Sequence, residues 1–329
     1  MSPFKAVIAG LAITAGLCTV QVAHADYPDR PVRMVVPNPP GGTNDKLARL
    51  VAERLTRDLG QPVVVENRPG ASTAIGAQAV ASSPSDGYTL LFGTTTTFVL
   101  NPLVRDDLPY DPARDFKIVS VIAETPPIIL ASVQSQFHTI QDLVQYAQAH
   151  PDQLMYSSAG TGTSLHTNME SFAAGTNLQL QHVPYQGSAP AMLALLRGDV
   201  PVMSEVVSGA VAQIKSGQVR ALAVGSEHRL ELIPDVPTIT ESGFSGFNGA
   251  GWWALAAPKG TPEDVIAKLR SVTNQIMQEP AFKEVFQPDG LVISPPRNAE
   301  QVEAYMKKEV QNWTSAVGLI DVKDEKPKS

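Results

Sequence analysis

The sequence of 329 residues is poor in cysteine and in charge. Its single cysteine, Cys18, excludes a disulfide framework and any zinc site built from several cysteines. Charged residues make up 17% and hydrophobic residues 43%, a balance that excludes an intrinsically disordered chain. Acidic residues outnumber basic ones, 32 to 25, and no Lys/Arg cluster is present. Nucleic acid is therefore not an expected partner.

The first 25 residues predict a cleavable signal peptide. Lys5 precedes an uncharged apolar run over residues 6–22, and Ala23-His24-Ala25 is a small-x-small cleavage site. The run is short for a membrane span. Cys18 follows the bulky Leu17, which is wrong for lipoprotein processing. No later stretch reaches 18 apolar residues, so we expect an exported, soluble mature protein.

The rest of the chain alternates buried-strand and helical patterns. The first set predicts strands at 32–36, 63–65 and 88–92 with helices ending near residues 59 and 82. After Pro126-Pro127 a second set begins, with strands at 128–133, 154–157, 180–183, 200–203 and 221–224. Helices between them are predicted at 139–150, 163–175 and 189–197. The first set is the pattern of an open parallel sheet covered by helices. Two such sets indicate an α/β fold of two lobes, with an open sheet in each lobe and a ligand cleft between them.

Catalytic and metal-binding patterns are absent from the sequence. There is no G-x-S-x-G elbow, and the histidines after the signal are scattered without metal-ligand spacing. The stretch 160–165 begins like a dinucleotide-binding loop, but Leu165 stands where the last glycine is required. We therefore expect no catalytic residue, no metal and no cofactor.

Two glycine-rich loops each lie between a predicted strand and a predicted helix. They span residues 39–45 and 157–164 and contain no Lys or Arg. A helix N-terminus carries about half a positive charge and free N–H groups, so such loops can hold a carboxylate or phosphate. The alternative for each loop is ordinary turn and cap chemistry. One loop in each lobe favours an anion held across the cleft, at the carboxyl ends of the strands.

Two further positions are candidates for the same cleft. Thr95 lies in a threonine run after the third strand, where a hydroxyl could cap a helix or contact a ligand. Glu205 follows the strand at 200–203 and could be a cleft carboxylate, or could be solvated or paired with a base. His166 and His182 are interpreted as packed or hydrogen-bonded residues rather than catalytic ones.

Short motifs spread over nearly the whole mature chain resemble one family. They include Tyr27-Pro28-Asp29-Arg30-Pro31, Pro39-Pro40-Gly41-Gly42, Glu66-Asn67-Arg68-Pro69-Gly70, Asp86-Gly87-Tyr88-Thr89-Leu90 and Pro234-Asp235-Val236-Pro237-Thr238. This pattern is similar to the Bug (Bordetella uptake gene) family, the solute-binding proteins of tripartite tricarboxylate transporters. The resemblance implies a periplasmic two-lobe binding protein of the Venus-flytrap, type II-like class. It implies lobe 1 from 26–124 and 250–329, and lobe 2 from 125–249.

The resemblance also implies site residues. Carried onto this sequence, Gly42, Thr43 and Asp45 belong to the first clamp. The second clamp comprises Ser158, Thr161, Thr163 and Ser164. This sequence departs from the family at Asn38, where an aromatic residue is frequent, and at Met203-Ser204-Glu205, which replaces a Phe-Asp pairing.

The leading functional hypothesis is a monomeric, non-catalytic binding protein for a small carboxylate. Dicarboxylic, tricarboxylic, aromatic and amino acid-like acids all remain candidates. The resemblance implies delivery to a membrane transporter with one large and one small subunit, and a sensor kinase is an alternative partner. The rival class, a secreted hydrolase, needs a nucleophile, a base and an orienting group that no spacing here supplies.

We predict cleavage of the exported chain between Ala25 and Asp26. The reason is that small residues at the −3 and −1 positions end the apolar run. N-terminal sequencing or the intact mass of the exported protein checks this. A mature form that keeps Cys18 with a lipid attached contradicts it.

Overall fold

The computed structural model describes residues 27–318 except 248, 287 and 289. The predicted signal peptide, Cys18 and the charged tail 321–329 lie outside the described residues. Within the described part of the chain, no helix combines the length and apolarity needed to cross a bilayer.

The first sheet has six strands, with β1 (Val32–Val36) and β2 (Val63–Asn67) at one end. Its full order is β11 (Val292–Ile293), β4 (Phe116–Thr125), β10 (Gly251–Pro258), β3 (Thr89–Thr94), β1 and β2. The strands β2, β1 and β3 are parallel, as predicted, but β10 is antiparallel to both β3 and β4. The parallel arrangement predicted for the strands near 32–36, 63–65 and 88–92 is therefore confirmed, and the sequence pattern did not address the antiparallel neighbours β10 and β4. Because β10 brings the chain back from the second sheet, it runs opposite to β4, which carries the chain out.

The second sheet has five strands in the order β7 (Leu180–Pro184), β6 (Leu154–Ser158), β8 (Val202–Val206), β5 (Pro127–Ser132) and β9 (Val219–Val224). Here β6 is parallel to β7 and β8, whereas β5 is antiparallel to β8 and β9. The chain enters this sheet between β4 and β5 and leaves it between β9 and β10. The lobe boundaries near residues 124 and 249 stay a prediction about where the two units separate.

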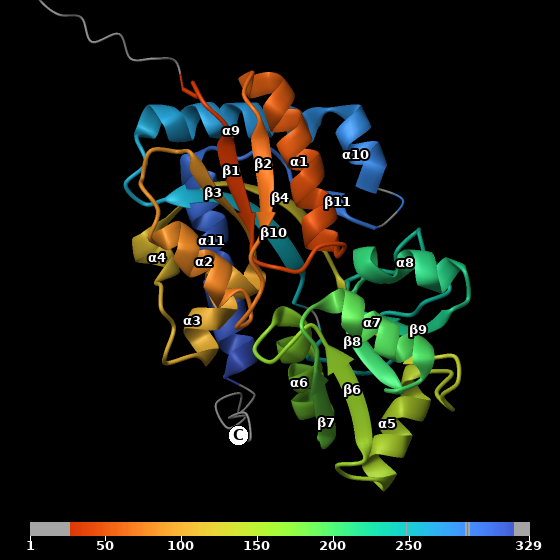
Figure 1. The fold of residues 1–329 in the computed structure, drawn as a ribbon. Helices are drawn as coiled ribbons and strands as arrows, with labels where there is room; N and C mark the ends of the chain where they lie inside the picture. The colour runs from red at the N-terminus through yellow and green to blue at the C-terminus, as the bar shows by residue number, and fades with distance from the viewer. Residues whose placement is uncertain (1–26, 248, 287, 289, 319–329) are drawn as a thin grey trace, which may run out of the picture.

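Helices cover both faces of both sheets (Figure 1). On the first sheet, one face packs against α1 (Thr43–Leu59), α9 (Glu263–Gln278) and α10 (Pro280–Phe286). Its other face packs against α2 (Ala74–Ala81), the π-helical turn η1 (Thr96–Leu100) and α11 (Ala299–Val317), with the short α3 (Asn101–Val104) and α4 (Pro112–Asp115) nearby. On the second sheet, α5 (Ile140–Ala149) and α6 (Ser164–Thr176) cover one face, and α7 (Ser188–Arg197) and α8 (Val207–Lys215) the other. The predicted two-lobed α/β architecture is thus present.

Helix α1 shows how the sequence builds this architecture. Leu47, Val51 and Leu55 recur every four residues and are buried against β1. The helix ends at Gly60, which adopts φ 72° and donates its N–H to the carbonyl of Thr56. The start of α1 is thereby held at the carboxyl end of β1, where the chain approaches the second lobe.

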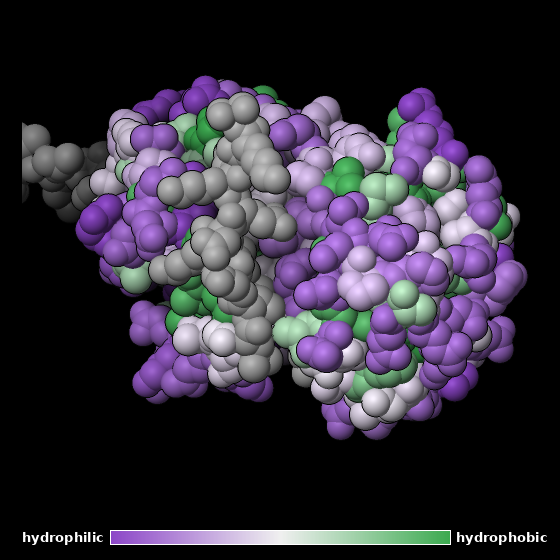
Figure 2. Space-filling view, turned by 90° about the horizontal axis from the view of Figure 1, so that it is seen from below, coloured by the Kyte–Doolittle hydropathy of each residue, from purple (hydrophilic) through white to green (hydrophobic). Residues whose placement is uncertain are grey.

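The molecular surface is mainly polar on the face that Figure 2 displays. Apolar residues appear there as separate patches between hydrophilic ones. Large hydrophobic side chains that are at least one-third exposed occur at Val64, Ile75, Val133, Met155, Leu193, Val285, Val292 and Val310. Scattered exposure of this kind is normal for a globular protein.

Stability should depend on β10, because this strand lies in the middle of the first sheet. Leu255 is fully buried there. Leu255→Ala should lower the free energy of unfolding by about 2–5 kcal/mol, through lost apolar burial and the cavity left behind. Leu193→Ala is the matched control, because Leu193 is 45% exposed on α7, and it should change stability by no more than about 0.5 kcal/mol. Urea unfolding without ligand measures both, and equal losses would contradict a core role for β10.

Candidate functional site

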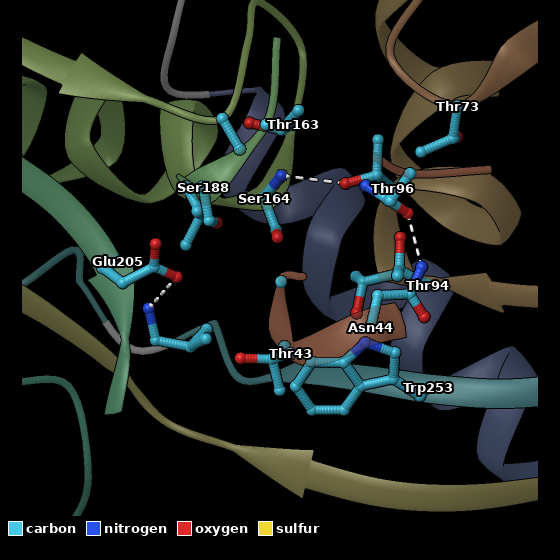
Figure 3. Close-up of a pocket in the computed structure, with 18 of the residues that line it drawn as sticks. Thr43, Asn44, Thr73, Thr94, Thr96, Thr163, Ser164, Ser188, Glu205 and Trp253 are labelled. Atoms are coloured by element: carbon cyan, nitrogen blue, oxygen red, sulfur yellow. Dashed lines mark hydrogen bonds between the residues drawn. The ribbon is translucent and has the colours of Figure 1, made fainter. Parts of the chain in front are cut away.

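A cavity of about 100 Å³ lies where the two lobes meet. From the first lobe it is lined by the loop before α1, the end of β3 and the start of β10. From the second lobe the start of α6, the start of α7 and the end of β8 contribute. Figure 3 shows Glu205 and Ser188 on one side of it, with Thr43, Asn44 and Trp253 on the other.

Seven of the ten predicted site residues line this cavity: Asn38, Gly42, Thr43, Thr95, Thr163, Ser164 and Glu205. The other three, Asp45, Ser158 and Thr161, are absent from the lining. Glu205 carries the only ionisable side chain among the described residues that line the cavity. All other polar groups there are hydroxyls, amides, indoles and backbone groups.

Asp45 organises the loop before α1. Its carboxylate accepts hydrogen bonds from the Gly41 N–H at 2.9 Å, the Asn67 amide at 2.9 Å and Arg49. Burial alone would raise the pKa of Asp45, but these three donors together hold it below its ordinary value. Asn67 also donates to the carbonyl of Asn38. Asp45 therefore holds the loop in shape from behind the cavity.

The N-terminus of α1 itself remains open toward the cavity. Its N-cap residue, Gly42, has no side chain to bond the N–H groups of the first turn. The N–H groups at the start of an uncapped helix need acceptors from outside the helix. Gly42, Thr43 and Asn44 line the cavity, so these donors lie at its wall.

The second predicted loop is closed by its own hydrogen bonds. Thr163 is the N-cap of α6, with a hydroxyl that accepts from His166 N–H and donates to the Gly160 carbonyl. The Ser164 N–H donates to Thr96 Oγ1 of the other lobe at 3.1 Å. The N-terminus of α6 is thus largely occupied, and this loop shows the turn and cap chemistry that the sequence left open.

A different helix of the second lobe opens onto the cavity. Helix α7 begins after Gly187, which adopts φ 116° and provides no side-chain cap. Gly187, Ser188 and Ala189 line the cavity. A Cβ built on Gly187 would lie 3.2 Å from the ring of Pro39, so glycine allows close approach to the first lobe. The sequence analysis missed this clamp, although a strand, a glycine and a helix follow one another there as in the first loop.

The threonine run after β3 makes hydrogen bonds that fix the neighbouring strand β10 beside the cavity. Thr95 Oγ1 accepts from the backbone N–H of Trp252 at 3.0 Å, and the Thr97 hydroxyl donates to Thr73. The Trp252 ring stacks on Phe98. The Thr95 hydroxyl therefore has a structural role, because it accepts a backbone hydrogen bond from β10.

The two adjacent tryptophans of β10 both line the cavity but differ in their polar contacts. The indole N–H of Trp252 donates to Glu309 at 2.8 Å. The indole N–H of Trp253 is buried and has no acceptor among the described residues. Trp253 consequently presents a free donor beside Thr43 and Asn44 (Figure 3).

Glu205 closes the second-lobe side of the cavity. It is 1% exposed, and its Oε1 accepts from the Val206 N–H at 2.8 Å. Burial raises the pKa of Glu205 to about 7, against the opposing effects of the Val206 N–H and the Ser188 hydroxyl. Ser188 lies beside the carboxyl group, and Oε2 accepts no hydrogen bond from the described residues.

Ser158 and His182 form a pair that the sequence spacing did not predict. Ser158 Oγ lies 2.7 Å from His182 Nε2, and the His182 ring stacks on His166. Ser158 is fully buried, and neither member of the pair lines the cavity. The pair therefore has no access to a substrate in that cavity. Within the described residues, no cluster of three or more His, Cys, Asp and Glu could hold a metal.

Comparison with known proteins gives consistent matches. A family model described as the tripartite tricarboxylate transporter family receptor matches residues 47–321. BugT of Bordetella pertussis is 34% identical over 320 residues, covering 96% of this chain and 97% of BugT. The solved structure of the periplasmic binding protein BugD is 34% identical with a TM-score of 0.83, covering 89% of this chain and 98% of BugD.

Two similar solved structures contain carboxylates. Rpa4515 of R. palustris with adipate has a TM-score of 0.86 and 32% identity, and the match covers 89% of this chain and 98% of Rpa4515. MatC of Rhodopseudomonas palustris with bound malate has a TM-score of 0.84 and 30% identity, and the match covers 88% of this chain and all of MatC. These similarities confirm the predicted periplasmic-binding-protein fold.

The two threonines at helix starts should behave differently when mutated. Thr43→Val removes a hydroxyl at the cavity wall that has no recorded hydrogen bond to a described residue. The variant should therefore weaken carboxylate binding by about 1–3 kcal/mol. Thr163→Val removes the N-cap of α6 and should lower the free energy of unfolding by about 0.5–2 kcal/mol. Calorimetric binding and urea unfolding of both variants separate these effects. If Thr43→Val binds normally and only Thr163→Val loses affinity, the ligand contacts the start of α6 rather than the start of α1.

Proposed function

Because this chain belongs to the tripartite tricarboxylate transporter receptor family, as its sequence predicts, we propose that it is a periplasmic solute-binding protein for a small dicarboxylate. It captures the solute between its lobes and delivers it to a transporter with one large and one small membrane subunit. It acts as a monomer and catalyses no reaction. The observation that carries this proposal is the pair of uncapped helix N-termini, one from each lobe, at one cavity whose described lining has no Lys or Arg.

The two helix starts match the two ends of a dicarboxylate. Each N-terminus carries about half a positive charge and N–H donors that still need acceptors. A carboxylate at Gly42–Asn44 and a second at Gly187–Ala189 would supply those acceptors. Anions bind at helix N-termini for this reason, and no Lys or Arg is required.

The cavity has the size of such a ligand. A water molecule requires about 10–15 Å³ of this kind of volume, so about 100 Å³ holds roughly seven to ten waters. Adipate and malate, the ligands of the two similar structures, have a comparable number of non-hydrogen atoms. A small dicarboxylate therefore fits better than a larger aromatic or tricarboxylic acid.

The middle of the cavity supplies neutral donors. The free indole N–H of Trp253 and the Thr43 hydroxyl lie on one wall, and the Ser188 hydroxyl lies on the other (Figure 3). A buried carboxylate without donors would be strongly destabilised. Selectivity among carboxylates consequently depends on the positions of these donors rather than on the net charge of the cavity.

Contacts beside the cavity support a closed arrangement of the lobes. The Ser72 hydroxyl donates to the Thr161 carbonyl, and the Ser164 N–H donates to Thr96. Each bond joins a segment of the first lobe to a segment of the second. We propose that ligand favours this closed state and that the lobes separate at the boundaries near residues 124 and 249.

A thermal-shift screen of organic acids tests the proposed function. A dicarboxylate present at 100 times its Kd should stabilise the protein by about 2.7 kcal/mol. Hexanoate, which has the length of adipate but lacks one carboxylate, should bind at least about tenfold more weakly because one helix N-terminus stays without an anion. Equal shifts with both acids would contradict binding at two helix starts.

Gly42→Leu is the matched variant for this screen. A Cβ at Gly42 meets no protein atom within 4 Å, and the backbone φ of −78° is ordinary. The variant should therefore keep its stability without ligand and lose the ligand-induced shift, because a larger side chain occupies space at the cavity wall. An ester-hydrolysis assay run in parallel should show no turnover. Turnover without any thermal shift would favour a hydrolase instead.

A further inference from the structure

Glu205 is chemically out of place in a cavity that receives anions. Among the described residues lining the cavity it is the one group that can carry a full charge, and that charge has the sign of the proposed ligand. With Glu205 ionised, a dicarboxylate would bring three negative charges together in a space whose positive potential comes from helix ends alone. Like charges in one buried site raise the pKa of at least one of them.

The surroundings of Glu205 compensate an ionised carboxylate only in part. The Val206 N–H, the Ser188 hydroxyl and the start of α8 favour the charged form, but burial outweighs them. Oε1 accepts the Val206 N–H, but Oε2 is inaccessible to solvent and accepts no hydrogen bond. The groups that face the carboxyl are uncharged: Ile128 of β5, Gly209 of α8, Ser188 of α7 and, across the cavity, Thr43 and Asn44. A buried lone pair without a donor is unfavourable, whereas a protonated Oε2 is itself a donor.

Gly209 shows how closely the fold encloses this carboxyl. A Cβ built on Gly209 would lie 2.9 Å from both Cδ and Oε1 of Glu205. The carboxyl group therefore has α8 directly behind it and cannot retreat from the cavity toward that helix. Movement of the carboxyl group toward α8 is therefore closed as a response to an anion that enters the cavity.

We propose that binding of a dicarboxylate protonates Glu205, so that the protein captures its ligand together with one proton. The proton comes from bulk water and adds to the carboxylate of Glu205, and no other bond forms or breaks. The protonated group then donates toward Ser188 or the ligand instead of repelling it. This inference rests on the proposed function, because it takes the ligand to be a dianion.

The expected pH dependence follows from the sign of this coupling. The pKa of Glu205 is already raised to about 7 by burial, and a bound dianion raises it further. Affinity should therefore be constant well below pH 7 and fall as pH rises through the pKa of the free protein, by up to about tenfold per pH unit. Both carboxyl groups of the ligand titrate below this window, so the ligand is a dianion throughout it.

Calorimetry with malate and adipate as probes tests the proposal. Between pH 6.5 and 8.5 the affinity of the better-binding probe should fall about five- to twentyfold. At pH 7.5, buffers with different ionisation enthalpies should reveal uptake of about 0.5–0.8 proton per bound ligand. An affinity that is constant over this range, with no proton uptake, overturns the inference.

Variants assign the proton to one residue. Glu205→Gln keeps donors at the same place but cannot titrate, so its affinity should vary less than about threefold over the same range and proton uptake should vanish. Glu263→Gln is the control, because Glu263 forms an exposed ion pair with Lys117 far from the cavity. It should behave like the unmodified protein. Proton uptake that persists in Glu205→Gln overturns the assignment.

Two further measurements separate this inference from the proposed function. Aspartate matches malate in shape but carries an ammonium group that an ionised Glu205 would attract. Tighter binding of aspartate than of malate, with affinity rising as pH increases, would mean that Glu205 pairs with a cation and would overturn the proton-coupled capture alone. If no carboxylate in the panel binds at any pH, the proposed function fails and this inference fails with it.

The titration of Glu205 can also be followed without ligand. Carbon-13 NMR of the free protein, assigned with Glu205→Gln, should show a carboxyl midpoint near pH 7. A midpoint close to 4, the ordinary value for a glutamate, overturns the inference whatever the ligand proves to be.

Discussion

The site between the two lobes is governed by one electrostatic constraint, which is that a carboxylate must be held in a cavity whose described lining includes no basic side chain. Lys and Arg are missing from the described lining, so the binding energy must come from oriented dipoles. Dipoles act over short distances and only in the right direction. The protein therefore needs helix starts whose positions are held accurately, and much of the surrounding hydrogen bonding serves that purpose.

The helix caps illustrate this requirement. Helix α6 begins at Thr163, whose hydroxyl accepts from the first turn and so uses up a donor. Helices α1 and α7 begin after Gly42 and Gly187, which have no side chain to do this. A glycine at the N-cap costs a helix only a few tenths of a kcal/mol relative to a good cap. This small loss leaves N–H groups available at the cavity wall.

The loop before α1 is stabilised by charged and amide side chains that do not line the cavity. Asp45, Asn67 and Arg49 form a connected set of hydrogen bonds between the start of α1 and the end of β2. A negative charge at Asp45 is itself favourable near a helix N-terminus. The residues that hold this loop in place thus carry more charge than the residues that line the cavity.

The sequence by itself determined the local elements and the first clamp, because these depend on neighbours along the chain. The spacing of Leu47, Val51 and Leu55 predicts α1, and the glycines before it predict an open helix start. Family motifs also sufficed to predict the two-lobed fold and the receptor family.

Only the tertiary structure decided which other groups meet at the cavity. The start of α6 is occupied by Thr96, which is 68 residues away along the chain, and α7 opens there instead. The reversed direction of β10 follows from its return between lobes, and the Ser158–His182 pair joins strands that pair only in the folded sheet. The isolation of Glu205 has the same origin. Whether a helix start or a carboxyl group finds a partner depends on residues distant in sequence, and local patterns contain no information about those partners.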